Sequence, residues 1–476
     1  MNDTTNHPLA DRLKKITEGF KKVEDVIRLR TEMDDATDVV MKPGDIDVSF
    51  GDSGRLVDAS LGMALPTHDG KYWILSNLRT NTTGTIRIKR VLEDGSPDPD
   101  FPLDGKIVTV HPEGNIDIIT AALQSNGKII IAGELEQATP EASFVTSIHP
   151  DGTLDTSFGD GGIKLIELDE NAPIIGVRDL TIQADDKIVL AVLASGPINS
   201  TVDTRVVRLT AEGRLDESFG DGGVVLDPSE MAMLRLAADR AGNLVLGGPQ
   251  DADAVLVRMT THGNYDQTFG AGGIVRWQAP DGAAMDITCL AIDDDDSIAV
   301  GGRINTEEHS GYWIAKVLPS GHPDYEFNSG KLLLFDDQIS TISVQTGQLV
   351  VHGLTTVEPD ISRMYVKRIN RDGSLDTTFG SGGIVVVPPP VDASDDVFRS
   401  HAFVQVRGQE TTLFVSDVTT RFTRTYSRAS KTFFRGVVVE TQLVRFILVH
   451  MNENEGAEEV KVGRIDETFH LPNHRS

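Results

Sequence analysis

The sequence has almost nothing that would cross-link it or anchor it in a membrane. It contains one cysteine among 476 residues. A single thiol cannot form an intramolecular disulfide, so no oxidising compartment is implied. Cys289 lies in an apolar run, where we expect a buried, unreactive thiol. No segment approaches the roughly 18 apolar residues of a membrane helix.

The first residues also lack an apolar core followed by small residues, so we expect no signal peptide. Cytoplasmic residence is the default expectation that follows. Leaderless export and surface association stay open as alternatives.

Positive charge and aromatic residues are scarce as well. There are 44 Lys and Arg against 72 Asp and Glu, which gives a net charge of −28. Such a surface repels phosphate backbones, so we expect no nucleic acid among the partners. The three tryptophans, Trp73, Trp277 and Trp313, are too few for one aromatic sugar pocket per repeat.

Known catalytic patterns are missing too. The sequence contains no HExxH, GxSxG or P-loop motif, and its histidines show no spacing suited to a metal. The run Asp293–Asp296 stands where related segments have turn residues, which predicts a solvated turn. We therefore expect no catalytic residue, metal or cofactor that a linear motif would reveal.

What the chain has instead is a repeated phrase in which Asp stands three residues before Phe. Clear copies are LDTSFGDGG at 154–162, LDESFGDGG at 215–223, YDQTFGAGG at 265–273 and LDTTFGSGG at 375–383. The Asp residues of all copies are Asp47, Asp98, Asp155, Asp216, Asp266, Asp324, Asp376 and Asp466. The Phe residues are Phe50, Phe101, Phe158, Phe219, Phe269, Phe327, Phe379 and Phe469. We call each Asp and Phe a marker Asp and a marker Phe.

Eight markers enclose seven units, most of them 50 to 61 residues long. Each unit has four short β-rich segments separated by Asp, Asn and Gly turns, as at 162–166, 179–183, 185–192 and 204–213. Four strands in a unit of this length are typical of a propeller blade. We predict an all-β fold, a seven-bladed β-propeller of four-stranded blades over 44–476, closed by strands from both ends. An amphipathic α-helix is predicted before it, within residues 1–43.

The phrases at 151–162, 212–223 and 372–383, and QSNGKIIIAG at 124–133, resemble the bacterial delta-60-repeat family. The resemblance extends over about 44–470. It implies a propeller, often within large surface-associated proteins. It brings no activity, cofactor or catalytic residue.

The markers themselves favour structure over ligand binding. An acidic glycine-rich loop resembles a calcium site, but the second acid is replaced by Ala271 and Ser381 in otherwise intact copies. We expect Asp47, Asp155, Asp216, Asp266 and Asp376 to cap turns, and Phe158, Phe219, Phe269 and Phe379 to plug the spaces between blades.

A cation also recurs on the fourth strand of each unit, with Ser147 as the exception. The cations are Arg90, Arg208, Arg258, Lys316 and Arg368. We predict that each pairs with its marker Asp, for example Arg208 with Asp216. The rival interpretation is a basic ring lining the channel for an anionic ligand.

Two stretches depart from the repeat and are the candidate contact sites. The first carries an apolar stripe at helical spacing: Leu9, Leu13, Ile16, Phe20, Val23 and Ile27. It packs either on the propeller itself or on a partner in a coiled coil or groove; a helix lying on a membrane surface is a minor alternative.

The second stretch, 418–450, is predicted as an inserted hairpin that turns near Gly436. Basic and aromatic residues alternate in it: Arg421, Phe422, Arg424, Tyr426, Arg428, Phe433 and Phe434. It serves either contact with a partner or folding back on the acidic body.

The leading functional hypothesis is therefore a non-catalytic binding or scaffold propeller that contacts a protein partner or a surface through these two stretches. The alternatives are a propeller hydrolase or lyase with a site at the channel mouth, and a carbohydrate-binding propeller.

Overall fold

A computed structural model describes the backbone of 55–58, 62–67, 69–79, 83–136, 142–166, 174–195, 202–226, 235–279, 282–305, 310–345, 347–358, 361–386, 398–407, 410–420, 429–438 and 444–450. Side chains are described only within 63–386. The predicted helix at 1–43 and the markers Asp47 and Phe50 lie outside the described residues. Among the described residues, the elements are strands and one 3-10 turn, η1 (Asn328–Gly330).

Strands β2 to β26 form six antiparallel sheets, each built from strands that are consecutive in the chain. The first contains β2 (Gly62–Pro66), β3 (Tyr72–Arg79), β4 (Gly84–Val91) and β5 (Lys106–His111). The second contains β6 (Asn115–Leu123), β7 (Ile129–Glu136), β8 (Ala142–Ile148) and β9 (Ile163–Ile166). The third contains β10 (Ile174–Ile182), β11 (Ile188–Ser195), β12 (Val202–Leu209) and β13 (Val224–Leu226).

The next three sheets repeat this order. The fourth contains β14 (Arg235–Ala238), β15 (Leu244–Gln250), β16 (Asp253–Met259) and β17 (Ile274–Trp277). In the fifth, β18 (Ala284–Met285) and β19 (Cys289–Ile292) both pair with β20 (Ile298–Asn305), followed by β21 (Ser310–Val317) and β22 (Leu333–Phe335). The sixth contains β23 (Gln338–Gln345), β24 (Gln348–Glu358), β25 (Ile361–Ile369) and β26 (Ile384–Val386).

A further sheet joins the beginning and the end of the described chain. Its antiparallel strands are β27 (Phe398–Arg407), β28 (Glu410–Thr420), β29 (Ala429–Val438) and β30 (Val444–His450). Strand β1 (Arg55–Asp58) pairs with β30 in parallel, with Arg55 opposite Phe446.

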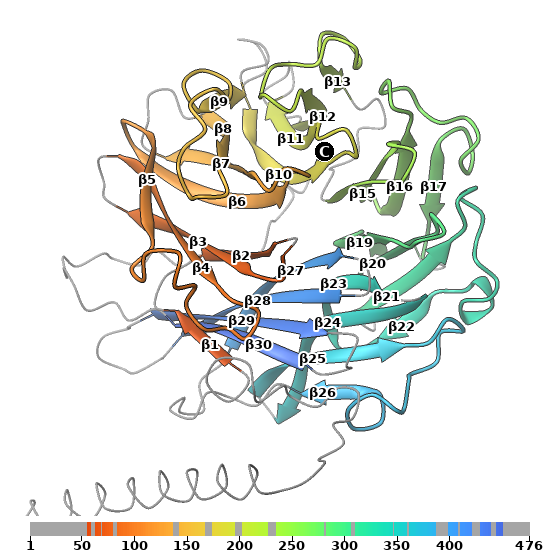
Figure 1. The fold of residues 1–476 in the computed structure, drawn as a ribbon. Coiled ribbons are helices and arrows are strands. Elements are labelled where there is room, and N and C mark those ends of the chain that lie inside the picture. Colours follow the sequence, from red (N-terminus) through yellow and green to blue (C-terminus); the bar gives the residue numbers. More distant parts are fainter. Residues whose placement is uncertain are drawn as a thin grey trace, which may run out of the picture. The chain divides into compact units, whose positions relative to one another are not determined.

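The sheets follow one another in chain order around a centre (Figure 1), and the innermost strand of each contacts the next. These contacts run from β2 to β6, β10, β14, β19, β23 and β27. Four-stranded sheets packed face to face around a centre form a β-propeller. The all-β propeller architecture predicted from the repeats is therefore confirmed.

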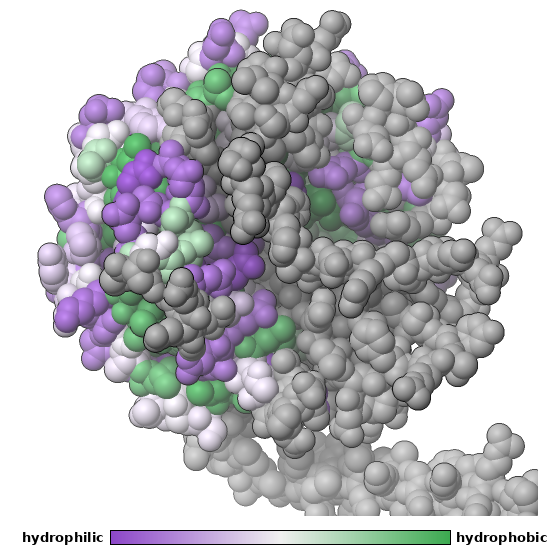
Figure 2. Space-filling model, turned by 180° about the vertical axis from the view of Figure 1, so that it is seen from behind, coloured by the Kyte–Doolittle hydropathy of each residue, from purple (hydrophilic) through white to green (hydrophobic). Residues whose placement is uncertain are grey.

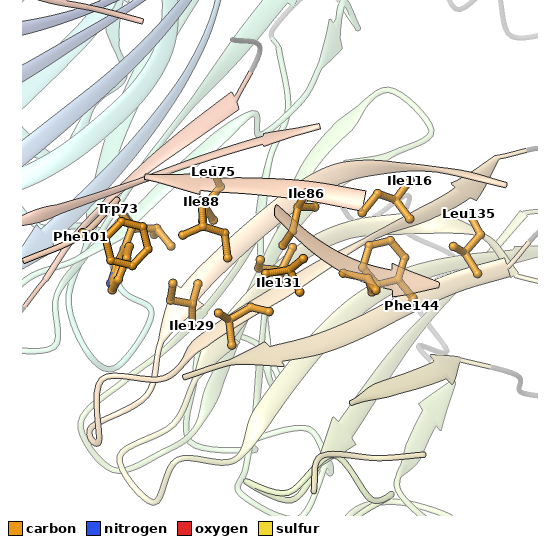
Figure 3. Packing of buried hydrophobic residues seen from close by; sticks show 14 residues of the cluster. Trp73, Leu75, Ile86, Ile88, Phe101, Ile116, Ile129, Ile131, Leu135 and Phe144 are labelled. Carbon is orange, nitrogen blue, oxygen red and sulfur yellow. The ribbon is translucent and has the colours of Figure 1, made fainter. Parts of the chain in front are cut away.

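The hydrophobic core is divided into layers between neighbouring sheets. Alternate residues of β7 point to opposite faces, so Ile129 and Ile131 pack against the first sheet, whereas Ile130 packs against the third. In Figure 3, Ile86 and Ile88 of β4 face Ile129 and Ile131. The unbroken apolar run after the turn at 126–128 is thus explained by a strand that is buried on both faces.

Four of the described marker Phe residues, Phe101, Phe158, Phe219 and Phe269, pack against a turn glycine of the following unit. The rings of Phe158, Phe219 and Phe269 are fully buried. Gly213, in the turn of the following unit, lies on the ring of Phe158, and a Cβ at Gly213 would stand 2.6 Å from it. Gly213 also has a φ of +81°, which favours glycine. The plugging role stays a prediction; the three rings are buried, as that role requires.

Replacing Phe219 with Ala is expected to lower the free energy of unfolding by about 3–5 kcal/mol, because the ring leaves a cavity between two sheets. Urea unfolding followed by circular dichroism measures this. Leu226→Ala is the matched control, since that side chain is 54% exposed, and it should shift the midpoint little. Equal midpoints for the two variants would contradict the plugging role.

Candidate functional site in the central cavity

The marker Asp residues are the most repeated acidic groups, so they are the first candidates for a ligand site. Asp216 Oδ2 accepts a hydrogen bond from Arg208 Nε at 2.8 Å, and Lys187 Nζ lies 3.3 Å from the same oxygen. Ser218 Oγ donates to Asp216 Oδ1 at 2.6 Å. Burial opposes ionisation, but these hydrogen bonds and the Arg208 charge outweigh it and lower the pKa of Asp216 to about 2.

The same pairing recurs in other units. Arg90 Nε lies 2.6 Å from Asp98 Oδ2, and Arg368 Nε lies 2.7 Å from Asp376 Oδ2. Arg258 contacts Asp266 at 2.8 Å. The predicted pairs of these arginines with their marker Asp are therefore present. The rival interpretation, a basic ring lining the channel, is wrong for these arginines because their side chains are committed to the marker loops.

A second polar group that the sequence interpretation missed also reaches the marker Asp. It comes from the residue before the third strand in several units: Lys71 and Lys128 lie 2.9 Å and 2.7 Å from Asp98 and Asp155, respectively. Gln348 Nε2 donates to Asp376 Oδ2 at 3.1 Å. Because Lys128 supplies the cation, Ser147 is tolerated on β8, where it donates to Asp155 at 3.4 Å. The recurring Lys in NGKI, DDKI and GKYW was the available signal.

Lys316 departs from the prediction. Its Nζ lies 3.1 Å from Asp293 Oδ2, and the structure gives it this partner in place of Asp324. Asp293 stands at the turn position where the second unit has Gln124, and it is 8% exposed. The predicted turn at 293–296 is present, but its first carboxylate is buried and paired rather than solvated.

Among the residues that the structure describes, no three His, Cys, Asp or Glu side chains come together in a way that would hold a metal ion. In the same part of the chain, no helix is long and apolar enough to cross a membrane.

A cavity of about 410 Å³ lies where the innermost strands of the first six sheets meet. Its lining comes from β2, β6, β10, β14, β19 and β23 and includes the charged residues Arg178, Asp179 and Arg235. Such a volume falls in the range of small-molecule sites. The cavity is therefore the best candidate functional site in the described residues.

Strand register places one residue from each sheet at the same level of the cavity. Asp179 is opposite Ala191, Arg235 is opposite Gly247, and Cys289 is opposite Gly301. Asp179, Arg235 and Cys289 each lie three residues before the last residue of their strand. The residues of this level, which we call the ring level, are Met63, Thr120, Asp179, Arg235, Cys289 and Thr341.

Three of the innermost strands have a β-bulge next to the ring level. The register skips one residue at Ile119 in β6, at Arg178 in β10 and at Ser340 in β23. A bulge re-aims the extra residue relative to the strand. Arg178 and Ser340 line the cavity as a result.

Hydrogen bonds hold Asp179, the acid of the ring level, in place. Asp179 accepts hydrogen bonds from the backbone N–H of Leu180 and of Leu236 on the neighbouring β14, both at 2.9 Å. Burial raises the pKa of Asp179 above its usual value, while Arg235 and the two backbone donors act against that rise. Asp179 thus ties β10 to β14 across the cavity wall.

Cys289 is buried as expected. Its Sγ contacts Gly301 O at 3.3 Å, and burial raises the thiol pKa to about 12. A thiol with this pKa is protonated at neutral pH and does not act as a nucleophile. His352 on β24 lies outside the cavity lining; it is fully buried, and burial lowers its pKa to about 3.

The two contact stretches predicted from the sequence are only partly visible. Leu13 to Ile27 and the basic residues at 421–428 lie outside the described residues. Phe433 and Phe434 lie on β29, for which the backbone alone is described. The predicted turn near Gly436 is wrong, because β29 continues through Gly436, which pairs with Leu413 and Phe446.

Comparison with known proteins supports the repeat architecture. Residues 124–158, 183–219 and 345–379 match a family described as "Domain of unknown function (DUF5122) beta-propeller". The chain thus carries propeller-family repeats. No curated protein matches the sequence.

Solved structures resemble the chain at low identity. The polysaccharide lyase Uly1 is 13% identical, with a TM-score of 0.42, over 80% of this chain and 90% of that one. The β-propeller domain of the trilobed protease from Pyrococcus furiosus is 10% identical, with a TM-score of 0.35, over 70% and 92%. The Pyrococcus horikoshii acylaminoacyl peptidase is 11% identical, with a TM-score of 0.38, over 83% and 59%.

The lowered pKa of Asp216 makes stability depend on pH. Its folded value of about 2 lies below its ordinary value of 3.8, so ionisation stabilises the fold above pH 4 and this contribution is lost as the pH falls towards 2. Asp216→Asn is expected to cost about 3–5 kcal/mol near neutral pH, because Arg208 is left buried without its partner, and to reduce the acid sensitivity of the melting temperature.

Thermal melts between pH 7 and pH 2 measure both effects. Asp221→Asn, an exposed position in the same loop, is the matched control and should behave like the wild type. Unchanged stability of Asp216→Asn at pH 7 would refute the structural pair.

Cys289 should be unreactive in the folded protein. We expect negligible reaction with DTNB at pH 8 and one thiol per chain after denaturation, since the chain has a single cysteine. Rapid labelling of the native protein would show instead that the cavity holds an accessible thiolate.

Proposed function

We propose that the protein is a non-catalytic binding propeller of seven blades, with delta-60-type repeats. The pairing of β1 with β30 supports a ring in which both ends of the chain contribute to the seventh blade. The repeat phrases at 151–162, 212–223 and 372–383 support the repeat type.

The non-catalytic assignment rests on a single observation, the lowered pKa of the repeated marker Asp residues. Asp155, Asp216 and Asp376 each have a pKa of about 2, and each is held by groups of its own unit. A general acid or base works best when its pKa lies near the working pH. These carboxylates therefore serve the scaffold rather than proton transfer.

The surface and the tryptophans are in line with a binding role that does not involve sugar stacking. On the coloured part of Figure 2, hydrophilic and hydrophobic residues are interspersed. Trp73 and Trp313 are buried, and Trp277 packs on Trp313 with ring centroids 5.5 Å apart. The two buried rings offer no face to a carbohydrate and one face of the half-buried Trp277 lies against Trp313, which argues against the lectin-like alternative.

Within this proposal, partner contact is assigned to the apolar stripe at 13–27 and to the basic-aromatic segment at 421–434. Both stretches lack the marker phrase that the scaffold uses. The stripe offers a hydrophobic face to a groove, and the segment offers cations to an acidic partner.

We expect that replacing Leu13, Phe20 and Ile27 with Asp in the full chain removes specific partners in affinity purification from native extract. Replacing Arg421, Arg424 and Arg428 with Gln tests the second stretch in the same way. Both lose interactions because an apolar face or a complementary charge is removed.

Quantitative mass spectrometry compares the recovered proteins with those of the wild type. The control replaces Lys14, Lys21 and Arg28, which lie beside the stripe, with Gln. Recovery of the same proteins by both triple variants, or no specific protein with the wild type, would disprove the assigned contacts.

A further inference from the structure

Two bulge residues next to the ring level carry polar groups that the scaffold does not use. Arg178 is the extra residue of the bulge in β10, and no hydrogen bond or ion pair joins it to another described residue. Ser340 is the extra residue of the corresponding bulge in β23, and its hydroxyl is buried without a hydrogen-bond partner in the described structure. Buried polar groups are ordinarily satisfied, so the Ser340 hydroxyl calls for an explanation. The Arg178 side chain is half-buried.

The charge of the cavity is opposite to that of the chain. Its described lining contains two cations, Arg178 and Arg235, and one anion, Asp179, which leaves a formal charge of +1. The chain as a whole carries −28. Both oxygens of Asp179 accept backbone hydrogen bonds, and no ion pair joins this carboxylate to Arg178 in the described structure.

The lining changes along the same strands. Three residues beyond the ring level, roughly 10 Å along a strand, the equivalent positions are aliphatic: Leu123, Ile182, Ala238 and Ile292. A polar, cationic level therefore lies next to an aliphatic one inside a single cavity.

We propose that the central cavity binds a small amphipathic carboxylate, with its anionic group at Arg178, Arg235 and Ser340 and its apolar body against the aliphatic level. A guanidinium presents a planar fork of donors that matches a carboxylate, and such charge-assisted bonds are strong when partly shielded from water. The Ser340 hydroxyl adds a donor from another sheet. This site is independent of the partner contacts proposed above.

Isothermal titration of the full chain with benzoate and with octanoate tests the proposal, with benzamide as the neutral counterpart of benzoate. We expect saturable binding of at least one carboxylate and roughly tenfold weaker binding, or none, of benzamide, because only the anion pairs with the arginines. Arg178→Gln should weaken carboxylate binding by about tenfold or more.

The matched control is Arg240→Gln, whose side chain is 61% exposed and pairs with Asp294; it should bind like the wild type. Arg178→Gln should keep the wild-type melting temperature, since Arg178 has no bond to lose within the described structure. The proposal is overturned if neither carboxylate binds, if benzamide binds as well as benzoate, or if Arg178→Gln binds like the wild type.

Discussion

The contact on which this fold most depends joins an arginine, a marker Asp and a marker Phe to the turn of the next sheet. Arg208 pairs with Asp216, lies with its guanidinium carbon 4.4 Å from the centre of the Phe219 ring, and donates from Nη1 to Thr261 O of the following unit at 2.5 Å. Arg258 repeats this arrangement with Phe269 and Pro319 O. A buried ion pair adds little net stability by itself, but here its donors also join two sheets, so local turn geometry and ring packing are set together.

Differences between the repeat units show that the ion pair of this contact is kept while the residues that form it vary. Ser147 replaces the arginine of β8, and Lys128 supplies the cation from the preceding turn. In the fifth sheet, Asp293 at the turn forms the ion pair with Lys316 of β21. Each unit whose side chains are described therefore keeps a cation beside a carboxylate, as expected when an unpaired buried charge would cost several kcal/mol.

These features determine how far the sequence alone could be interpreted. The marker spacing was sufficient for the propeller, and the recurring cation of the fourth strand was sufficient for the pair of Arg208 with Asp216, because the marker recurs in every unit and the cation in most of them. The lysine before the third strand recurs in three units, at Lys71, Lys128 and Lys187, and was therefore predictable from the same repeat. The bulges at Arg178 and Ser340 were not predictable, since a one-residue shift in pairing depends on the partner strand and leaves no recurring residue in the sequence.

The difference between residues that recur in the units and residues that do not also indicates where the function of a repeat protein lies. At the marker positions the units carry the same chemistry, since each serves the contact between sheets. At the ring level the backbone positions are equivalent, yet the side chains are Met63, Thr120, Asp179, Arg235, Cys289 and Thr341. Packing between identical strands does not require such variety. A ligand that lacks the symmetry of the ring would be recognised by unlike groups at one level, so the variety of side chains at the described ring-level positions favours the cavity as a binding site.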